Sequence, residues 1–386
     1  MATENKKYIP AFRFPEFQND GEWSMLELGK FAKIVMGQSP SSEAYNERGE
    51  GVPLLQGNAD IKDRHQVVRV YTTDITKTCD INDIIMTVRA PVGTISRASF
   101  KSCIGRGVCA IKTDSEYLYQ YLISIEQEWD KLASGSTFVS ITSNQIFDRI
   151  IFVPLTIQEQ KKIADCLSSL DKYIDATKRK FDLLKEHKKG LMQRLFPAKG
   201  KTTPELRFQE FQNDGEWRPR PLSDILNYEQ PTPYIIEDDI YKKEGTPVLT
   251  ANKGFILGYT DESFGIYNKL PVIIFDDFTT DKKYVDFPFK IKSSAIKLLT
   301  LKYEERDNLR FIFECMNKVL FEEKEHKRYY ISTYQHINIY VPSLQEQNKI
   351  ADTLLFVDKQ ISEYDKKIKA LELHKKCLMQ QLFPKL

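Results

Sequence analysis

Residues 158–197 read QEQKKIADCLSSLDKYIDATKRKFDLLKEHKKGLMQRLFP, and residues 345–384 read QEQNKIADTLLFVDKQISEYDKKIKALELHKKCLMQQLFP. Along both stretches, apolar residues are spaced alternately by four and three, which is the heptad pattern of helices that pack along a shared seam. The pattern predicts two matched long helices. The predicted seam residues are Ile163, Leu167, Leu170, Ile174, Phe181, Leu184, Leu191, Ile350, Leu354, Val357, Ile361, Ile368, Leu371 and Leu378.

Both stretches carry signals for where a helix begins and ends. Thr156-x-x-Glu159 and Ser343-x-x-Glu346 are capping boxes, and each follows a proline and a strand-like run, Ile150–Val153 or Ile339–Val341. Each stretch stops at a Phe-Pro pair, because proline cannot continue the helical hydrogen-bond ladder. Residues 157–196 would then make a rod of about 60 Å. Two unrelated amphipathic helices are the alternative, which their length disfavours, since ordinary helices have about 11–12 residues.

A second, shorter block is also repeated. The run Phe17-Gln18-Asn19-Asp20-Gly21-Glu22-Trp23 returns letter for letter as Phe211-Gln212-Asn213-Asp214-Gly215-Glu216-Trp217, and Arg13-Phe14 returns as Arg207-Phe208. Residues 24–150 and 218–338 have little in common. The layout is therefore short block, variable domain and long block, followed by the same series again. A shared frame with unlike domains suggests two different specificities.

Connectivity predicts how these parts are arranged. The second helix must run back along the first, so we expect an α+β protein with two α/β domains at opposite ends of a long antiparallel two-helix coiled coil. This internal repeat would have a pseudo-twofold axis, and Lys188 and Lys375 at matching seam positions would help to fix the register. Residues 12–23 should dock where the second helix ends, near Leu382 and Phe383. The predicted segments are 1–156, 157–197, 198–343 and 344–386.

Composition excludes several classes of protein. Apolar residues make up 41% and charged residues 28% of the chain, as in ordinary globular proteins. The N-terminus has no apolar run of signal-peptide length, and no stretch is apolar enough for a membrane span, which predicts a cytoplasmic protein. The six cysteines have no C-x-x-C spacing, which predicts reduced thiols and no metal site. A net charge of +2 neither favours nor excludes a nucleic-acid partner.

Catalytic motifs are missing from the sequence. There is no Pro-Pro, so the [N/D]-P-P-[F/Y] motif of methyltransferases is absent, and there is no G-x-G-x-x-G. Gly200-Lys201-Thr202 resembles the end of a phosphate-binding loop, but a helix precedes it rather than a strand. We predict that the chain is not an enzyme and binds no cofactor or metal. An enzyme with an unfamiliar active site is the alternative.

The repeated motifs resemble those of a known family. The duplicated Q-E-Q-x-K-I-A-D…H-K-x-x-L-M-Q-x-L-F-P helices, the lead-ins from Phe14 to Trp23 and from Phe208 to Trp217, and the two unlike domains resemble a specificity subunit of type I restriction–modification enzymes over essentially the whole chain. The resemblance implies a bipartite, asymmetric target in double-stranded DNA, with one half read by each target recognition domain. It also implies two methyltransferase subunits on the paired helices and restriction/translocase subunits in the full complex. Adenine methylation and cleavage, with S-adenosylmethionine, ATP and Mg, would belong to those partners.

Candidate DNA contacts lie on loops of both variable domains. Loops with close-approach glycines carry Arg, which suits guanine, Gln and Asn, which suit adenine, and Ser and Thr, which suit phosphate. For each single residue, an ordinary turn is the alternative. For the whole protein, the alternative is a scaffold that joins two protein partners without touching DNA. Asp276 and Asp277 could accept from cytosine, although capping of a strand end is favoured. The candidates are Gln38, Ser39, Gln56, Asn58, Arg89, Arg106, Ser136 and Thr137 in the first domain, and Thr232, Tyr234, Thr250, Asn252, Lys253, Thr279, Thr280, Lys282, Arg328 and Tyr330 in the second.

Overall fold

The chain forms two compact units, each mixing helices and strands. The structure, a computed structural model, describes residues 8–132, 140–238, 240–251, 254–319, 321 and 328–384. The first unit comprises residues 1–179 and 366–386, and the second comprises residues 180–365. Both unit boundaries fall inside long helices, α5 (Ile157–Arg194) and α8 (Leu344–Leu382). Each unit therefore contains one part of each helix, and the predicted division into four segments stays a prediction.

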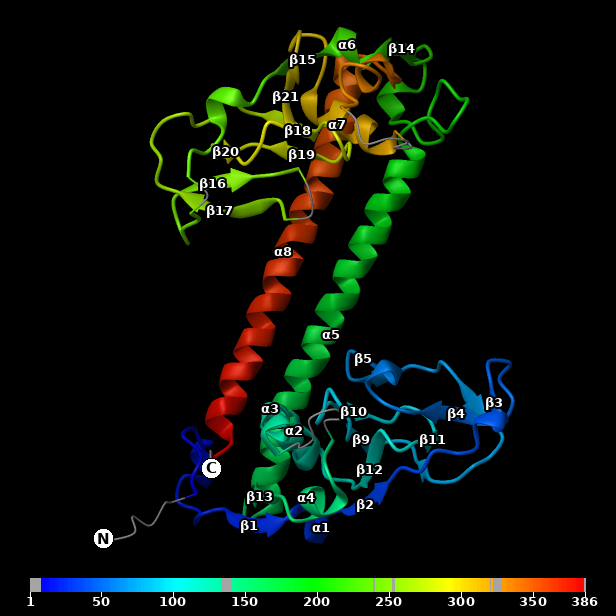
Figure 1. Cartoon of the computed structure of the whole chain (residues 1–386), viewed down its shortest axis with the longest axis vertical. Helices are drawn as coiled ribbons and strands as arrows, with labels where there is room; N and C mark the ends of the chain where they lie inside the picture. Colours follow the sequence, from blue (N-terminus) through cyan, green and yellow to red (C-terminus); the bar gives the residue numbers. More distant parts are fainter. Residues whose placement is uncertain are drawn as a thin grey trace. The chain divides into compact units, whose positions relative to one another are not determined.

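Two sheets form the centre of the first unit (Figure 1). Strand β9 is buried along its whole length, as expected for a central strand made of Ile, Met and Thr. A parallel pair, β4 with β11, lies in the five-stranded sheet. The six-stranded sheet has the order β2 (Lys33–Met36), β12 (Val108–Lys112), β9 (Ile84–Thr87), β10 (Ile95–Arg97), β6 (His65–Gln66) and β5 (Ile61–Lys62). The five-stranded sheet has the order β3 (Tyr45–Asn46), β7 (Tyr71–Thr72), β4 (Val52–Leu55), β11 (Ser102–Ile104) and β8 (Thr78–Cys79).

Helices and a two-stranded ribbon complete the first unit. Helix α2 starts where the Ser115 side chain accepts a hydrogen bond from the Leu118 backbone N–H. It packs on α5, where Gln120 donates to Asp171 at 2.8 Å. The large buried side chains of this core include Tyr117, Trp129 and Phe152. The remaining elements are α1 (Leu28–Phe31), α2 (Glu116–Ser124), α3 (Glu126–Leu132), α4 (Ser143–Phe147), and the ribbon of β1 (Ser24–Glu27) with β13 (Ile150–Val153).

The second unit has its own core and a smaller set of strands. Its helix α7 packs on α8, where the Asn308 side chain donates to Asn348 at 2.8 Å. The four-stranded sheet has the order β15 (Leu226–Glu229), β21 (Ile296–Leu301), β18 (Val272–Asp276) and β19 (Lys282–Val285). The three-stranded sheet has the order β17 (Ile256–Thr260), β16 (Thr246–Leu249) and β20 (Lys290–Ile291). The remaining elements are α6 (Leu222–Ile225), α7 (Leu309–Lys318), and the ribbon of β14 (Arg218–Pro221) with β22 (Asn338–Val341).

The two units share a topology although their variable sequences differ. The order β15-β21-β18-β19 repeats the order β2-β12-β9-β10, and all these pairs are antiparallel. The parallel pair β16–β20 repeats the parallel pair β4–β11. The Gly105 backbone N–H donates to the Leu55 carbonyl at 2.7 Å, and the Lys292 backbone N–H donates to the Leu249 carbonyl at 3.2 Å. Positions after these strands can therefore be compared residue by residue.

The starts of the two long helices differ in one respect from the prediction. The Thr156 and Ser343 hydroxyls accept from the backbone N–H of Glu159 and Glu346, as in a capping box. The two glutamate side chains, however, bind arginines of the short blocks. Arg13 donates twice to Glu159 at 2.7 Å, and Arg207 donates twice to Glu346 at 2.9 and 2.7 Å. The glutamates of both motifs thus hold the short block rather than complete the cap.

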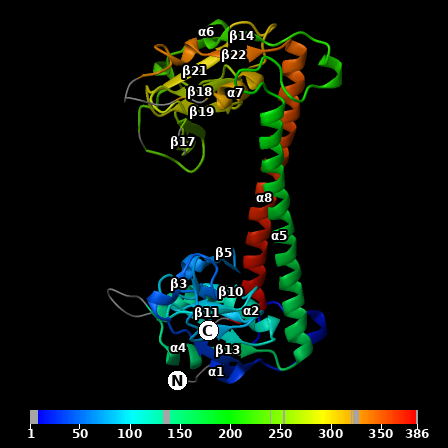
Figure 2. The same ribbon diagram turned by 90° about the vertical axis from the view of Figure 1, so that its right-hand side faces the viewer.

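The short blocks dock at helix ends, which confirms the prediction for residues 12–23. The Phe12 backbone N–H donates to the carbonyl of Gln381, and the Leu206 N–H donates to that of Arg194, both at 2.9 Å. Leu382 and Phe383 lie in the same core as Trp23 and Ile163. In each unit, the start of one long helix therefore meets the end of the other, so the two run in opposite directions there. Within each unit their segments lie side by side in both views (Figure 1, Figure 2).

Ion pairs join the helices within each unit. In the first unit Lys375 binds Asp171 at 2.5 Å, and in the second the matching Lys188 binds Asp358 at 2.7 Å. Burial lowers the pKa of the Lys375 ammonium. None of the predicted seam residues is exposed. Those that are buried are Ile163, Leu167, Ile174, Leu184, Ile350, Leu354, Val357 and Ile368.

Candidate nucleic-acid interface

Loops from distant parts of the sequence meet at one end of the strands in the first unit. The Gln38 backbone N–H donates to the Ile104 carbonyl at 2.8 Å, which joins the loop after β2 to the last residue of β11. The Ser39 hydroxyl accepts from the backbone N–H and the Nε of Arg106, at 3.2 and 3.4 Å. We call the loops at residues 37–40, 55–58, 88–91 and 104–107 the first loop cluster.

Glycines allow the loops of this cluster to approach closely. A Cβ on Gly107 would lie 1.9 Å from the Gln56 carbonyl oxygen, and one on Gly37 would lie 2.1 Å from the Gly105 carbonyl oxygen. No larger residue fits at either position without a backbone shift. The Asp60 carboxylate also holds the turn, since it accepts from the backbone N–H of Gln56 at 2.7 Å.

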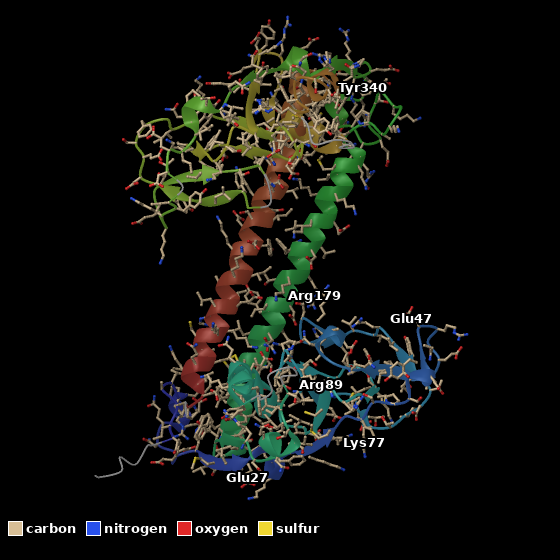
Figure 3. All side chains as sticks on the ribbon, viewed as in Figure 1. Glu27, Glu47, Lys77, Arg89, Arg179 and Tyr340 are labelled. Atoms are coloured by element: carbon tan, nitrogen blue, oxygen red, sulfur yellow. The ribbon has the colours of Figure 1, made fainter. Side chains whose placement is uncertain are left out.

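The cluster exposes side chains that can bind DNA. Arg89 follows Val88, whose N–H donates to the Gly107 carbonyl at 2.9 Å, so the Arg89 loop lies next to the Arg106 loop. Figure 3 labels Arg89 on the first unit. The side chains of Gln38, Gln56, Arg89 and Arg106 are exposed, and those of Ser39 and Asn58 are partly exposed. Ser136 and Thr137 lie outside the described residues.

Two residues of this surface were missed by the sequence analysis. The Thr76 hydroxyl donates to the Gln38 carbonyl at 2.5 Å. The Lys77 carbonyl accepts from the Ile104 N–H at 2.8 Å, and the Lys77 side chain, labelled in Figure 3, is exposed. The Lys77 backbone thus lies beside the last residue of β11, from which the Arg106 loop begins. Neither residue sits in a Gly-rich motif, so no local signal identified them.

The second unit forms an equivalent cluster from the corresponding loops. We call residues 230–234, 250–251, 254–255, 277–282 and 292–295 the second loop cluster. The Asp277 N–H donates to the Ala295 carbonyl at 2.8 Å, matching the bond from Val88 to Gly107 in the first unit. Lys292, which the sequence analysis missed, occupies the position of Gly105. Thr232 and Thr279 are exposed, and Thr250 and Lys282 are partly exposed, whereas Asn252 and Lys253 lie outside the described residues.

Some candidates of the second unit already have partners. The Tyr234 hydroxyl donates to Glu229 at 2.7 Å, and this hydrogen bond raises the pKa of Tyr234. Burial lowers the pKa of the Lys282 ammonium, which lies 5.7 Å from the centre of the Tyr334 ring. Arg328 is exposed, and its guanidinium lies 5.9 Å from the centre of the Phe278 ring.

The acidic pair at the end of β18 caps the backbone, as the sequence analysis favoured. The Asp276 carboxylate accepts from the N–H groups of Phe278 and Thr279, both at 2.9 Å. The Asp277 carboxylate accepts from the Tyr330 N–H at 2.8 Å.

Two predicted contacts of the second unit are buried. Tyr330 is 1% exposed because its ring packs against Phe275, and Thr280 is 9% exposed. Burial removes both side chains from the candidate contact surface.

The described residues contain neither a metal cluster nor a membrane-spanning helix. In the described part of the chain, no group of three or more His, Cys, Asp or Glu side chains could hold a metal ion. No described helix is both long and apolar enough to cross a membrane.

Comparison with known proteins gives the family. The model of the type I restriction modification DNA specificity domain matches residues 20–186 and again residues 214–373. A type I restriction enzyme MjaX specificity subunit of Methanocaldococcus jannaschii is 38% identical over 186 residues, which are 46% of this chain and 43% of that protein. The EcoR124I/EcoR124II specificity subunit of Escherichia coli is 48% identical over 132 residues, 33% of this chain and 32% of that protein. The matched regions thus span less than half of either relative.

A solved structure shares the whole fold. The S subunit of a type I restriction-modification system from M. genitalium superposes with a TM-score of 0.70 at 16% identity, over 98% of this chain and 100% of that one. At this identity the likeness concerns the fold alone. The family model, in contrast, covers most of both units, one copy in each. The predicted resemblance is therefore confirmed, and the chain belongs to the type I restriction modification DNA specificity domain family.

Proposed function

We propose that this chain is the DNA-reading subunit of a type I restriction–modification complex, and that each unit reads one half of a bipartite target. The observation that carries the proposal is the pair of loop clusters. They stand at equivalent positions of one repeated topology but expose different side chains. One frame with two unlike reading surfaces suits an asymmetric target.

The long helices suit a spacer between the two readers. Helix α5 has 38 residues and α8 has 39, so each is about 57 Å long at 1.5 Å per residue. We propose that they pair along their length as an antiparallel coiled coil and hold the two target recognition domains at opposite ends. With one base pair per about 3.4 Å, two readers held this far apart would leave unread base pairs between two half-sites.

Matched exposed residues support two copies of one partner. Asp165 and Asp352, Lys172 and Lys359, and Lys189 and Lys376 are identical in the two helices and exposed in both. A solvated helix surface does not need matched side chains, whereas two identical partners do. The partners we propose are two methyltransferase subunits on the paired helices, joined by restriction/translocase subunits. S-adenosylmethionine, ATP and Mg would bind those subunits. The complex would be cytoplasmic, because the DNA that it reads lies in the cytoplasm.

The proposed contact surface consists of the exposed and partly exposed candidates. Arginine can bind both acceptors of a guanine, and glutamine or asparagine can bind both polar groups of an adenine, whereas hydroxyls and lysines suit phosphates. The proposed contacts are Gln38, Ser39, Gln56, Asn58, Arg89 and Arg106 in the first unit, and Thr232, Tyr234, Thr250, Thr279, Lys282 and Arg328 in the second.

Mapping methylated adenines tests the proposal. The chain would be expressed with its methyltransferase partner in a host without other methylation, and the DNA sequenced for modified bases. We expect one bipartite, asymmetric sequence with an unread spacer. A complex that assembles normally but methylates without sequence preference would favour the alternative of a scaffold that does not touch DNA.

Substitutions then assign the first half-site. Arg89→Ala and Arg106→Ala should each weaken reading of one half by about 1–3 kcal/mol, because each guanidinium would lose a base contact. Methylation at the other half should keep its sequence preference. Lys101→Ala is the control, because Lys101 lies just before β11, whereas Arg106 lies beyond its other end. Unchanged reading of both halves by Arg89→Ala and Arg106→Ala would remove these residues from the contact surface.

A further inference from the structure

A polar triad with two buried charges joins the second loop cluster to β21. The Lys297 ammonium donates to the Gln230 side-chain carbonyl at 3.0 Å and lies 3.3 Å from the Asp277 carboxylate. The charged side chains of Lys297 and Asp277 are each 1% exposed. We call Gln230, Asp277 and Lys297 the polar triad.

The triad joins segments that carry proposed DNA contacts. Gln230 begins the loop of Thr232, and Asp277 begins the loop of Thr279. Lys297 lies in β21, directly after the loop at residues 292–295. The Asp277 carboxylate and backbone carbonyl accept from the N–H groups of Tyr330 and Tyr329, both at 2.8 Å, which ties in the segment of Arg328. One network, with the buried Asp277 and Lys297 at its centre, therefore links four segments of the second reading surface.

The first unit holds apolar residues at the same three places. Strand register matches Lys297 with Cys109, and the register of β15 extended by one residue matches Gln230 with Met36. The bonds to Ala295 and Gly107 match Asp277 with Val88. Val88 and Cys109 are buried in the hydrophobic core, with Met36 packed against it. The shared topology consequently forms without these charges.

A buried ion pair is a poor way to stabilise a fold. Removing two charges from water costs free energy that their attraction often does not regain, and well-packed apolar residues in their place are often neutral or stabilising. The first unit forms the same topology with apolar residues at these places, so folding does not require the triad. The triad must therefore serve a role that only the second unit has. Ion pairs and hydrogen bonds have fixed partners and directions, so they can set one loop arrangement where apolar contacts would allow several.

We propose that Gln230, Asp277 and Lys297 are positioning residues that fix the loops of the second cluster and thereby determine which bases the second unit reads. This inference rests on the proposed function. It assigns specificity to Asp277 and Lys297, which are themselves too buried to touch DNA, and to the exposed Gln230 that Lys297 holds.

The test separates stability from reading. The double variant Lys297→Met with Asp277→Asn removes both charges at nearly the same volume, and the asparagine keeps an acceptor for the Tyr330 N–H. The single variant Lys297→Met leaves a buried carboxylate without its cation and should melt at a lower temperature. The double variant should regain much of that loss. Met36→Leu, a volume-conserving change at the matched place in the first unit, is the control and should alter neither property.

The readout is half-site selection by the chain assembled with its methyltransferase partner. A DNA library randomised in both half-sites is methylated, and the modified molecules are sequenced. We expect the double variant to select the first half-site as the wild type does, while discrimination in the second falls by about 5- to 150-fold at one or more positions. Wild-type selection of both halves, or equal loss of both, would overturn the positioning role. A wild-type complex that selects no sequence at all would instead overturn the proposed function itself.

Discussion

Gly107 shows how one missing Cβ brings two segments of the first reading surface together. A methyl group there would lie 1.9 Å from the Gln56 carbonyl oxygen, so one of the two loops must move. Gly107→Ala should cost about 1–3 kcal/mol of folding stability and weaken reading of the first half-site. Thermal unfolding and methylation mapping measure the two effects. Gly57→Ala is a matched control, because a Cβ on Gly57 meets no atom within 4 Å and its backbone is extended at φ 172°.

The arginine of each short block closes its unit. Arg13 and Glu159 have side chains that are 5% and 1% exposed, and Trp23 Nε1 also donates to Glu159 at 3.3 Å. Arg13→Ala should lower the free energy of unfolding by about 3–5 kcal/mol, because it leaves a buried carboxylate without its partner. Denaturant unfolding measures it. The double variant Arg13→Met with Glu159→Met should lose less free energy of unfolding than Arg13→Ala does. Equal losses in the two variants would mean that the Arg13 and Glu159 charges are not coupled.

At the scale of elements, the long helices were predictable and the reading loops were only partly so. A heptad repeat is local, so Leu167 and Leu354 could be assigned to the core from spacing alone. The meeting of Gln38 with Ile104 depends on strand pairing across more than sixty residues, which no local pattern encodes. Tyr330 was misplaced for the same reason. The basic and aromatic residues around it suggested a DNA contact, whereas the Tyr330 ring packs on Phe275 of a distant strand.

The helix seam can be tested by one charge in each helix. Leu170→Asp or Ile361→Asp would place a carboxylate among partly buried apolar side chains, so each variant should lose stability and assembly with the methyltransferase partner. Size-exclusion chromatography of the complex measures assembly. Asp175→Asn is a control on the exposed surface of α5. A Leu170→Asp variant that assembles and melts like the wild type would argue against the seam.

Cysteines report which face of α8 a partner covers. Cys377 is exposed, whereas Cys109 is buried and burial raises the pKa of its thiol to about 12. A thiol reagent at pH 8 should therefore label Cys377 and leave Cys109 unmodified in the folded chain. Adding the methyltransferase partner should slow labelling of Cys377 if the partner binds beside Lys376. Peptide mass spectrometry identifies the sites. Labelling of Cys377 at an unchanged rate in the assembled complex would place the partner elsewhere.

At the scale of the whole molecule, two cores carry two reading surfaces. Each unit has its own hydrophobic clusters, and the short blocks close each unit with the same set of bonds, from Arg13 to Glu159 and from Arg207 to Glu346. The sequence could predict this duplicated frame because identical letters mark it. It could not predict that the unlike domains share a topology, since alternating apolar patterns allow many residues to build the same sheet.

Separate cores predict that changes in the two readers act independently on DNA affinity. Sites without shared partners usually contribute additively, within about 0.3–0.5 kcal/mol. Arg106→Ala in the first unit and Arg328→Ala in the second should therefore reduce the binding free energy of the assembled complex by the sum of their single effects, as measured by titration at fixed salt. Arg106→Ala with Ser39→Ala is the contrast, because these side chains share a hydrogen bond and should couple. A coupling energy above about 1 kcal/mol between Arg106 and Arg328 would mean that the two clusters read DNA as one surface.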